Sequence, residues 1–191
     1  MIDNHKKYIF IHVSKTGGTS IEHALNPHVP LDTSDAASQK GNTSFKEKHW
    51  PAKQYKFDYP QKFESYFTFA FVRNPWDRFV SNWNWFEYLN MHKDETFESW
   101  LTKAVGAEVY SYEHMLKEHG ETIVDFVGKF ENLQSDFNHI CKTLGVSPIT
   151  LPHKNNLSKR PHYSRYYSKT TKRLVAEHFS WAIEEYGYEF E

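Results

Sequence analysis

The feature that most limits how this chain can fold is a short apolar run that leads directly into a glycine-containing loop. Residues 8–13, YIFIHV, are β-branched and aromatic, which is typical of a buried strand. Residues 14–18 form the loop, and residues 19–25 then look like the start of a helix that stops before Pro27. A strand, a loop and a helix in this order favour an α/β fold.

The rest of the sequence continues this alternation. A second strand is predicted at residues 66–72, and Pro75 suits the first position of the helix that follows. A third strand is predicted at residues 122–130. The predicted helices are residues 75–90, 97–103, 112–118, 133–144 and 170–186. Strands that alternate with helices predict an α/β fold with a central parallel sheet flanked by helices on both faces. The polar residues 26–48 predict a long surface loop.

The composition is that of a single globular domain. The chain has 191 residues, so we predict one domain over residues 1–191, and its 17% aromatic content excludes disorder of the whole chain. Cys141 is the only cysteine, which excludes intramolecular disulfides and cysteine-rich zinc sites. A net charge of −1 argues against a general binder of polyanions such as nucleic acids. No apolar stretch approaches the roughly 18 residues of a membrane-spanning helix, and a reducing, cytoplasmic setting is the expectation.

Positive charge is concentrated toward the C-terminus. Residues 137–176 contain no Asp or Glu but include Lys142, Lys154, Lys159, Arg160, Arg165, Lys169, Lys172 and Arg173. This run predicts either a solvated basic face or a local surface that attracts anions. The sequence leaves both interpretations open.

The loop after the first strand has the composition of a phosphate-binding turn. Two adjacent glycines allow a tight turn and a close approach of the backbone to a ligand, and the N–H groups at the start of the next helix favour an anion. Hydroxyl and ammonium groups add hydrogen-bond donors and a point charge. The predicted phosphate-binding residues are Lys15, Thr16, Gly17, Gly18, Thr19 and Ser20. The lysine precedes the glycines, so the loop is not a Walker A motif, and an ordinary strand-to-helix turn is the alternative.

A second set of polar residues follows the strand at residues 66–72. Arg73 comes directly after this strand, at the edge where open α/β sheets bind ligands, and Ser81 lies about two turns into the next helix. An arginine and a hydroxyl in this arrangement predict a site for a second phosphate. The alternative is that Arg73 forms a local ion pair with Asp77 at the helix start.

These two segments resemble those of a known enzyme family. Residues 10–20, FIHVSKTGGTS, look like the 5′-phosphosulfate-binding loop of sulfotransferases, and residues 71–81, FVRNPWDRFVS, look like their 3′-phosphate-binding segment. Residues 129–133, 151–158 and 186–190 resemble the carbohydrate sulfotransferase branch, in the same order. That branch includes Golgi chondroitin and uronyl 2-O enzymes and bacterial relatives. The chain is similar to a soluble member of bacterial type, because no membrane anchor or disulfide is predicted.

The resemblance implies a fold, a donor and a reaction. The fold would be that of P-loop-containing nucleotide hydrolases. The donor would be 3′-phosphoadenosine-5′-phosphosulfate, which leaves as adenosine 3′,5′-bisphosphate, and the sulfuryl group would pass in line to an acceptor hydroxyl, with a saccharide as the expected class. Lys15 would stabilise the departing phosphate, the rest of the loop would hold the 5′-phosphate, and Arg73 with Ser81 would hold the 3′-phosphate that ATP lacks. No metal is implied, because Lys15 and the helix N-terminus supply the positive field.

A general base must accept the proton of the acceptor hydroxyl. A histidine or a carboxyl group of raised pKa suits this role. The resemblance favours His49, in the segment of residues 48–53 that precedes the second strand, and the alternative is a surface histidine at a helix start. His12 and His23 are predicted to be structural. In the acid-free run, either Lys159 and Arg160 would close over the phosphates of the donor, or Arg165 and nearby lysines would attract an anionic acceptor such as an acidic polysaccharide.

Two other functions remain open from the sequence. One is a small P-loop kinase that uses ATP, and the other is a non-catalytic module that binds a nucleotide or a polyanion. The paired phosphate motifs favour the sulfotransferase interpretation over both. Trp50, Trp76, Trp83 and Trp85 would either stack on a sugar or adenine ring or belong to the core.

Overall fold

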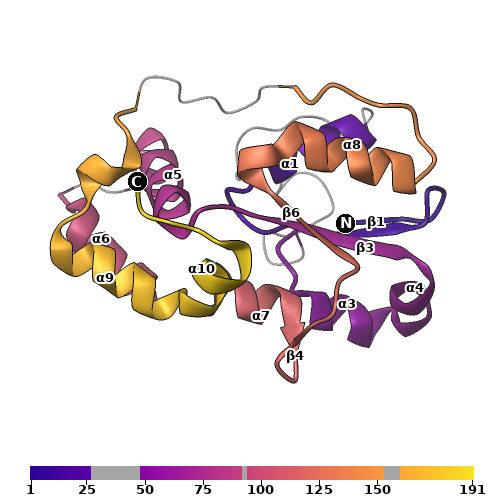
Figure 1. Ribbon diagram of the computed structural model, residues 1–191, viewed down its shortest axis with the longest axis horizontal. Helices are drawn as coiled ribbons and strands as arrows, with labels where there is room; N and C mark the ends of the chain where they lie inside the picture. The colour runs from indigo at the N-terminus through magenta and orange to yellow at the C-terminus, as the bar shows by residue number, and fades with distance from the viewer. Residues whose placement is uncertain (27–47, 92–93, 153–159) are drawn as a thin grey trace. The chain divides into compact units, whose positions relative to one another are not determined.

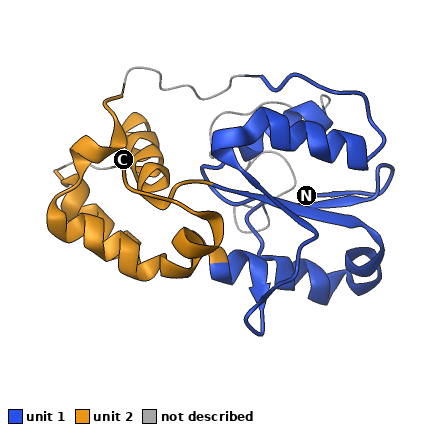
Figure 2. Ribbon diagram, in the orientation of Figure 1, with its two compact units in different colours: residues 1–72, 113–156 blue, residues 73–112, 157–191 orange. Residues whose placement is uncertain are grey.

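The computed structural model describes residues 1–26, 48–91, 94–152 and 160–191, so the predicted loop at residues 26–48 lies almost entirely outside the described residues. The chain divides into two compact units (Figure 2). Unit 1 comprises residues 1–72 and 113–156, and unit 2 comprises residues 73–112 and 157–191. The single domain expected over residues 1–191 stays a prediction.

Unit 1 is built around a four-stranded sheet (Figure 1). The strand order is β1 (Ile2–Asp3), β2 (Tyr8–Ile11), β3 (Phe67–Val72) and β6 (Phe126–Lys129). β3 pairs in parallel with both β2 and β6, whereas β1 pairs with β2 in an antiparallel hairpin. The prediction of an α/β fold with a mostly parallel central sheet is therefore confirmed, and the C-terminal ends of β2 and β3 lie at the same edge of the sheet.

Helices cover both faces of this sheet, as predicted. α1 (Gly18–Leu25) and α8 (Leu133–Thr143) lie on one face, and α3 (Ala52–Asp58) and α4 (Pro60–Ser65) lie on the other (Figure 1). On the α1 and α8 side, alternate strand residues pack against both helices in one cluster, which includes Tyr8, Phe10, Phe69, Phe71, Ile21, Leu25, Phe137 and Ile140. Gly128 of β6 faces this cluster. A Cβ at that position would lie 2.5 Å from Cε1 of Phe71, so the ring requires a glycine opposite it.

The strand predicted at residues 122–130 is divided in the structure. β6 begins only at Phe126, and β5 (Glu121–Thr122) instead pairs with β4 (Lys117–Glu118) in a separate hairpin. The same hairpin ends the helix predicted at residues 112–118, because α7 covers only Tyr112–Leu116. The two turn residues, His119 and Gly120, have φ angles of 53° and 85°. Two successive left-handed residues form the hairpin turn that the helical interpretation overlooked.

Unit 2 is helical. It contains α5 (Pro75–Tyr88), α6 (Phe97–Ala104), α9 (Lys169–His178) and α10 (Ser180–Tyr186), with the 3-10 turns η1 (Glu108–Tyr110) and η3 (Tyr163–Tyr166). The prediction of a single helix over residues 170–186 is wrong, since α9 and α10 are separated at Phe179. The ring of Phe179 is buried and lies edge-on to the rings of Phe79 and Tyr112. This packing comes from distant residues, so the local apolar spacing does not reveal the break.

Aromatic side chains form much of the interior of unit 2. Trp76, Trp83 and Trp85 of α5 are buried, and Nε1 of Trp76 donates to the main-chain oxygen of Lys172 at 3.0 Å. These three tryptophans therefore belong to the core of unit 2. Trp50 is half-buried in unit 1, where its ring lies edge-on to Tyr55. Across the described ranges, no helix combines the length and the apolar character that crossing a membrane requires.

Candidate functional site

The loop after β2 turns through two left-handed residues. Lys15 has a φ angle of 63° and Gly17, the N-cap of α1, has a φ angle of 84°. Glycine adopts this conformation without cost, whereas at Lys15 it is strained. Thr16 is fully buried between them, and its Oγ1 donates to the main-chain oxygen of Val13 at 2.8 Å. The hydroxyl of Thr16 thus holds the turn in place.

Both glycines of the loop are required by their surroundings. A Cβ on Gly17 would lie 2.8 Å from Cδ2 of Leu133, at the start of α8, and a Cβ on Gly18 would overlap the imidazole ring of His12. Among the described residues, no side chain caps the N-terminus of α1, and the first turn of this helix contains no acidic residue. These are the features of a helix end that binds an anion. All six predicted loop residues are brought together here, at the C-terminal end of β2.

A cluster of charged and imidazole side chains adjoins the loop. Nδ1 of the buried His12 lies 2.7 Å from Oε1 of Glu22 on α1, and Nζ of Lys48 lies 3.5 Å from Oε2 of the same carboxylate. Burial raises the pKa of Glu22, but the neighbouring His12 and Lys48 outweigh it and lower the pKa to about 2. Glu22 is therefore an ionised carboxylate shared by His12 and Lys48.

His49, the predicted base, belongs to the same cluster. Its Nδ1 lies 2.7 Å from the main-chain oxygen of His12, and the two imidazole rings pack edge to face with their centroids 4.7 Å apart. A carbonyl oxygen only accepts hydrogen bonds, so Nδ1 of His49 is the nitrogen that carries the proton. Burial lowers the pKa of His49 to about 3. The ring is therefore neutral at physiological pH, and its Nε2 is unprotonated.

The sequence interpretation gave no role to Glu22 or Lys48 of this cluster, and it assigned His12 only a structural role. A signal for Glu22 was present, because it is the only acidic residue between Asp3 and Asp32. It also lies four residues after Gly18, on the helix that the loop opens. Its partners, His12 and Lys48, come from directly after β2 and from the segment before α3, and this convergence is visible only in the folded chain.

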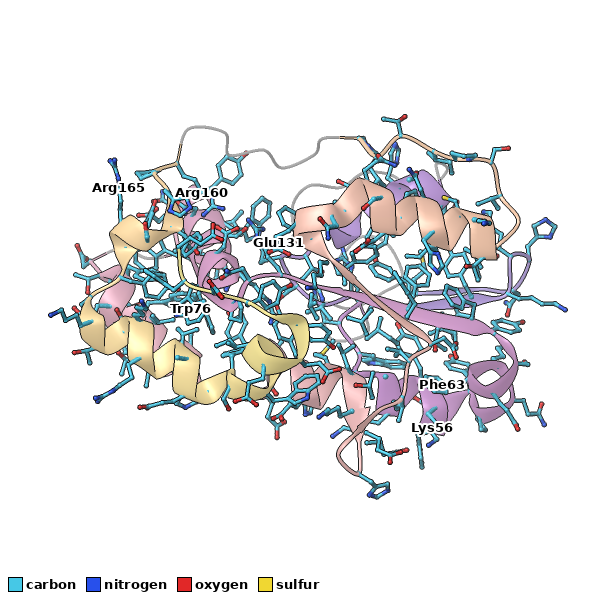
Figure 3. All side chains as sticks on the ribbon, in the orientation of Figure 1. Lys56, Phe63, Trp76, Glu131, Arg160 and Arg165 are labelled. Carbon is cyan, nitrogen blue, oxygen red and sulfur yellow. The ribbon has the colours of Figure 1, made fainter. Side chains whose placement is uncertain are left out.

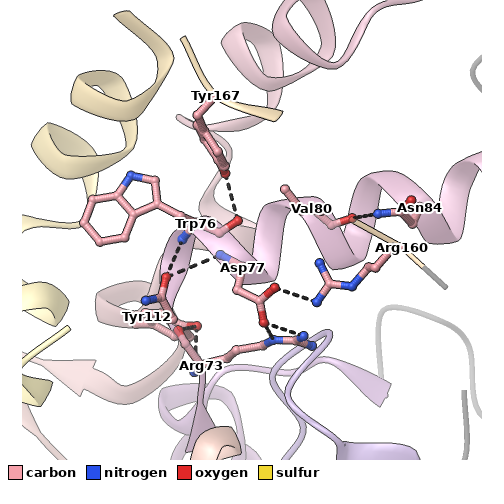
Figure 4. Close-up of polar contacts among 9 residues, drawn as sticks. Arg73, Trp76, Asp77, Val80, Asn84, Tyr112, Arg160 and Tyr167 are labelled. Atoms are coloured by element: carbon pink, nitrogen blue, oxygen red, sulfur yellow. Dashed lines mark hydrogen bonds and ion pairs between the residues drawn. The ribbon is translucent and has the colours of Figure 1, made fainter. Parts of the chain in front are cut away.

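Arg73 is buried and belongs to an ion-pair network of unit 2 (Figure 4). Its Nε and Nη2 donate to Oδ2 of Asp77 at 2.8 and 2.6 Å, and Nη2 of Arg160 donates to Oδ1 of the same carboxylate at 2.5 Å. Burial raises the pKa of Asp77, but the charges of Arg73 and Arg160 hold it below its usual range. The local ion pair considered for Arg73 is therefore present. Two guanidinium groups around one carboxylate still leave a net positive charge.

The main chain of Arg73 is held by the hydroxyl of Tyr112. The amide N of Arg73 donates to Oη of Tyr112 at 3.0 Å, and the same hydroxyl donates to the carbonyl oxygen of Arg73 at 2.6 Å. The ring of Tyr112 is buried beside Arg78, whose Cζ lies 4.5 Å from the ring centroid. The backbone of Arg73 is thus fixed directly after β3.

Arg160 and Asp77 also line an open pocket of unit 2. The pocket has a volume of about 290 Å³, and its other lining residues are Pro161, His162 and Tyr163. Nη1 of Arg160 is buried and has no hydrogen-bond partner within the part of the chain that the structure describes. Ser81 is partly exposed one helical turn after Asp77. Lys159, which was predicted beside Arg160, lies outside the described residues.

The described cations of the acid-free run are divided between the two units. Lys142 lies in unit 1, whereas Arg160, Arg165, Lys169, Lys172 and Arg173 lie in unit 2. Acidic partners come from outside the run, since Arg160 pairs with Asp77 and Arg173 pairs with Glu177. Figure 3 shows Arg165 extending away from the helices, and its side chain is exposed. Among the described cations of the run, Arg160 is the one that lines the pocket.

The chain is similar to known proteins in sequence and in fold. The model of the sulfotransferase family, Sulfotransfer_2, matches residues 1–190. An uncharacterized protein of Archaeoglobus fulgidus is 28% identical over 108 residues, which cover 54% of this chain and 87% of that protein.

Two solved structures share the fold. A sulfotransferase from Alicyclobacillus acidocaldarius has a TM-score of 0.54 at 15% identity, covering 96% of each chain. The mouse sulfotransferase SULT7A1, solved in complex with PAP, has a TM-score of 0.60 at 17% identity, covering 96% of this chain and 86% of that one. These likenesses confirm the predicted P-loop-like α/β fold. The chain belongs to the sulfotransferase family, as the sequence predicts.

Proposed function

We propose that this chain transfers the sulfuryl group of 3′-phosphoadenosine-5′-phosphosulfate to a hydroxyl group of a carbohydrate. The observation that carries the proposal is the loop of residues 14–18, where left-handed residues and two sterically required glycines open α1 at the C-terminal end of β2. The mouse sulfotransferase of the same fold was solved with PAP, the product of this donor, which supports the same donor here.

The 5′-phosphosulfate would bind at this loop. The backbone N–H groups at the start of α1 and the hydroxyls of Thr19 and Ser20 would contact the 5′-phosphate. Thr16 would act mainly through its backbone, because its hydroxyl already donates to Val13. Lys15 would place its ammonium group near the oxygen that bridges phosphorus and sulfur, where negative charge develops as the bond breaks.

The 3′-phosphate would bind at the network around Asp77. Arg73 and Arg160 leave a net positive charge there, and the buried Nη1 of Arg160 has a hydrogen bond to donate. Ser81, one turn further along α5, would add a hydroxyl, and Lys159 would add a second charge beside Arg160. This set of residues would distinguish the donor from ATP, which has no 3′-phosphate.

His49 would act as the general base. Its Nε2 would take the proton of the acceptor hydroxyl while the acceptor oxygen attacks sulfur, and the bond between sulfur and the bridging oxygen would break. The electron pair of that bond would stay on the 5′-phosphate of adenosine 3′,5′-bisphosphate, where Lys15 compensates its charge. The neutral ring of His49 has a lone pair on Nε2 to accept the proton, and burial, which lowers its pKa to about 3, makes it a weaker base than a free imidazole.

The carbohydrate acceptor and the cellular setting rest on the sequence. Residues 129–133 and 186–190 resemble the carbohydrate branch of the family, which supports a sugar hydroxyl as the acceptor. The single cysteine, Cys141, is buried, which supports a cytoplasmic enzyme that does not depend on disulfides.

Calorimetric titration with adenosine 3′,5′-bisphosphate, with ATP and AMP in parallel, tests the donor site. We expect the bisphosphate to bind more tightly than ATP or AMP. Arg160→Gln should weaken its binding by roughly tenfold or more, because a hydrogen bond to a charged group contributes about 1.5–3 kcal/mol. Arg165→Gln is the matched control, since Arg165 belongs to the same segment but is exposed.

Other results of this titration would favour one of the two alternative functions. Equal or tighter binding of ATP would favour the kinase, and binding of none of the three nucleotides would favour a non-catalytic module. Once the bisphosphate binds, transfer from the labelled donor to a panel of mono- and oligosaccharides tests the acceptor class. Transfer only to acceptors that are not sugars would contradict the carbohydrate assignment.

A further inference from the structure

We infer that Glu22 is a positioning residue for the general base: its carboxylate holds both His12 and Lys48, and through them it fixes the orientation and tautomer of His49. The inference rests on the proposed role of His49 in sulfuryl transfer. It assigns to this acidic residue of α1 a task in the reaction that neither the loop motif nor the family match provides.

The first contact runs through His12. Oε1 of Glu22 lies 2.7 Å from Nδ1 of His12, so this imidazole ring is held to α1. The main-chain oxygen of His12 in turn accepts the hydrogen bond from Nδ1 of His49, and the ring of His12 packs against the ring of His49. The carbonyl oxygen that selects the tautomer of His49 and the ring that packs against His49 therefore both belong to His12, the residue that Glu22 holds.

The second contact runs through Lys48. Oε2 of Glu22 lies 3.5 Å from Nζ of Lys48, the residue that directly precedes His49 in the chain. The side chains of Lys48 and Glu22 are 22% and 18% exposed, so water screens this pair only in part. One carboxylate thus contacts the side chain of the residue before His49 and the ring of the residue whose carbonyl group accepts from His49.

The position of Glu22 on α1 links the base to the phosphate-binding loop. Glu22 lies one helical turn after Gly18, and the ring of His12 occupies the space where a Cβ of Gly18 would be. A shift of the loop would therefore move His12, and the contacts of Glu22 resist such a shift. A geometry of this kind keeps the base at a constant distance from the phosphate-binding turn.

A simpler role for Glu22 is to satisfy the buried ring of His12 and nothing more. In that case its removal would lower the stability of the protein but leave the ring of His49 unchanged. The two roles are separated by the tautomer of His49, which long-range proton–nitrogen correlation spectra report directly in protein labelled with ¹⁵N-histidine. The signals of His49 are identified by their loss in His49→Gln.

We expect wild-type His49 to be protonated at Nδ1 alone. In Glu22→Ala both ring-nitrogen shifts of His49 should move toward intermediate values, because the ring samples both tautomers. Glu22→Gln should show a smaller change, since its amide oxygen can still accept from His12 but cannot balance the charge of Lys48. Glu118→Gln is the matched control, because it also removes a carboxylate paired with a lysine of unit 1, Lys56.

Kinetics provide the second measurement. With an acceptor from the saccharide panel, Glu22→Ala should lower kcat about tenfold, a part of the roughly 10²–10⁴-fold that a positioned base contributes, and leave the KM for the donor unchanged. Binding of adenosine 3′,5′-bisphosphate should also be unchanged. If Glu22→Ala fails to fold, Glu22→Gln carries both measurements.

Three results would overturn the inference in distinguishable ways. A single Nδ1-protonated tautomer and a wild-type kcat in the Glu22 variants would reject positioning while His49 remains the base. A parallel loss of kcat and of bisphosphate affinity would show that Glu22 supports the loop instead. Full activity of His49→Gln would reject the proposed base itself, and the positioning role would fall with it.

Discussion

At the residue scale, the absence of a side chain at Gly18 is what allows His12 to pack against the start of α1. The imidazole of His12 fills the volume that a Cβ would need, and its Nδ1 remains in contact with Glu22. A single methyl group at this position would therefore disturb the phosphate-binding turn and the base together.

Gly18→Ala tests this packing. We expect a loss of stability of about 1–3 kcal/mol, which is typical of overpacking in a filled interior, and weaker binding of adenosine 3′,5′-bisphosphate. Denaturant titration and calorimetry measure the two effects. Gly106→Ala is the control, because the nearest atom to a Cβ there is 3.9 Å away. An unchanged affinity in Gly18→Ala would show that the loop tolerates displacement of His12.

The low pKa of His49 makes stability depend on pH. Burial lowers this pKa from 6.5 in the unfolded chain to about 3 in the folded protein, so below about pH 6.5 the unfolded chain binds a proton that the folded protein excludes. The free energy of unfolding should therefore fall as pH drops from 6.5 toward 3. Denaturant titrations across this range measure the slope.

The variant His49→Gln provides the comparison for this pH dependence, since the glutamine side chain does not titrate. We expect a shallower dependence of stability on pH in this variant. His12 has its pKa lowered in the same direction, by burial, so part of the slope should remain. An identical slope in wild type and His49→Gln would contradict a buried, neutral His49.

At the element scale, the start of α5 determines where the residues around Asp77 lie. The side chain of Asn74 accepts hydrogen bonds from the amide N–H groups of Trp76 and Asp77, and Pro75 occupies the first position of the helix. This cap fixes the first turn, from which Asp77 reaches both arginines.

Asn74→Ala should lower stability by about 1 kcal/mol, as expected for a lost cap, and should also weaken binding of the bisphosphate. Thr96→Ala is the matched control, because Thr96 caps α6 through the amide of Ser99 and has no part in the proposed site. Thr96→Ala should lower stability without changing affinity. Equal losses of affinity in both variants would mean that the cap acts only through general stability.

At the scale of the whole molecule, binding of the bisphosphate should raise the melting temperature. A ligand at 100 times its Kd stabilises the folded state by roughly 2.7 kcal/mol. Scanning calorimetry with and without the bisphosphate measures this shift, and Lys15→Ala and Arg160→Gln should reduce it. One cooperative transition would support the prediction of a single domain over residues 1–191, whereas separate transitions would contradict it.

The sequence predicts the parts of this molecule that depend on local patterns. The apolar runs at residues 8–13 and 66–72 reveal β2 and β3, and the glycines after the first run reveal the loop that opens α1. The proline at position 75 reveals the start of α5.

Contacts between distant residues are what the sequence does not predict. Arg160 reaches Asp77 across 83 positions of the chain, and His49 reaches the carbonyl group of His12 across 37. The break at Phe179 and the convergence on Glu22 have the same origin. No local pattern encodes such contacts, because they depend on how the elements pack.

The hydroxyl of Tyr112 limits which residues can replace this tyrosine. It offers the main chain of Arg73 an acceptor and a donor at once, as a neighbouring strand would. Phenylalanine has the same shape but neither function, and tryptophan can only donate. Substitution by either therefore removes a hydrogen-bond partner from buried backbone groups, so position 112 requires the oxygen atom of tyrosine as well as an aromatic ring.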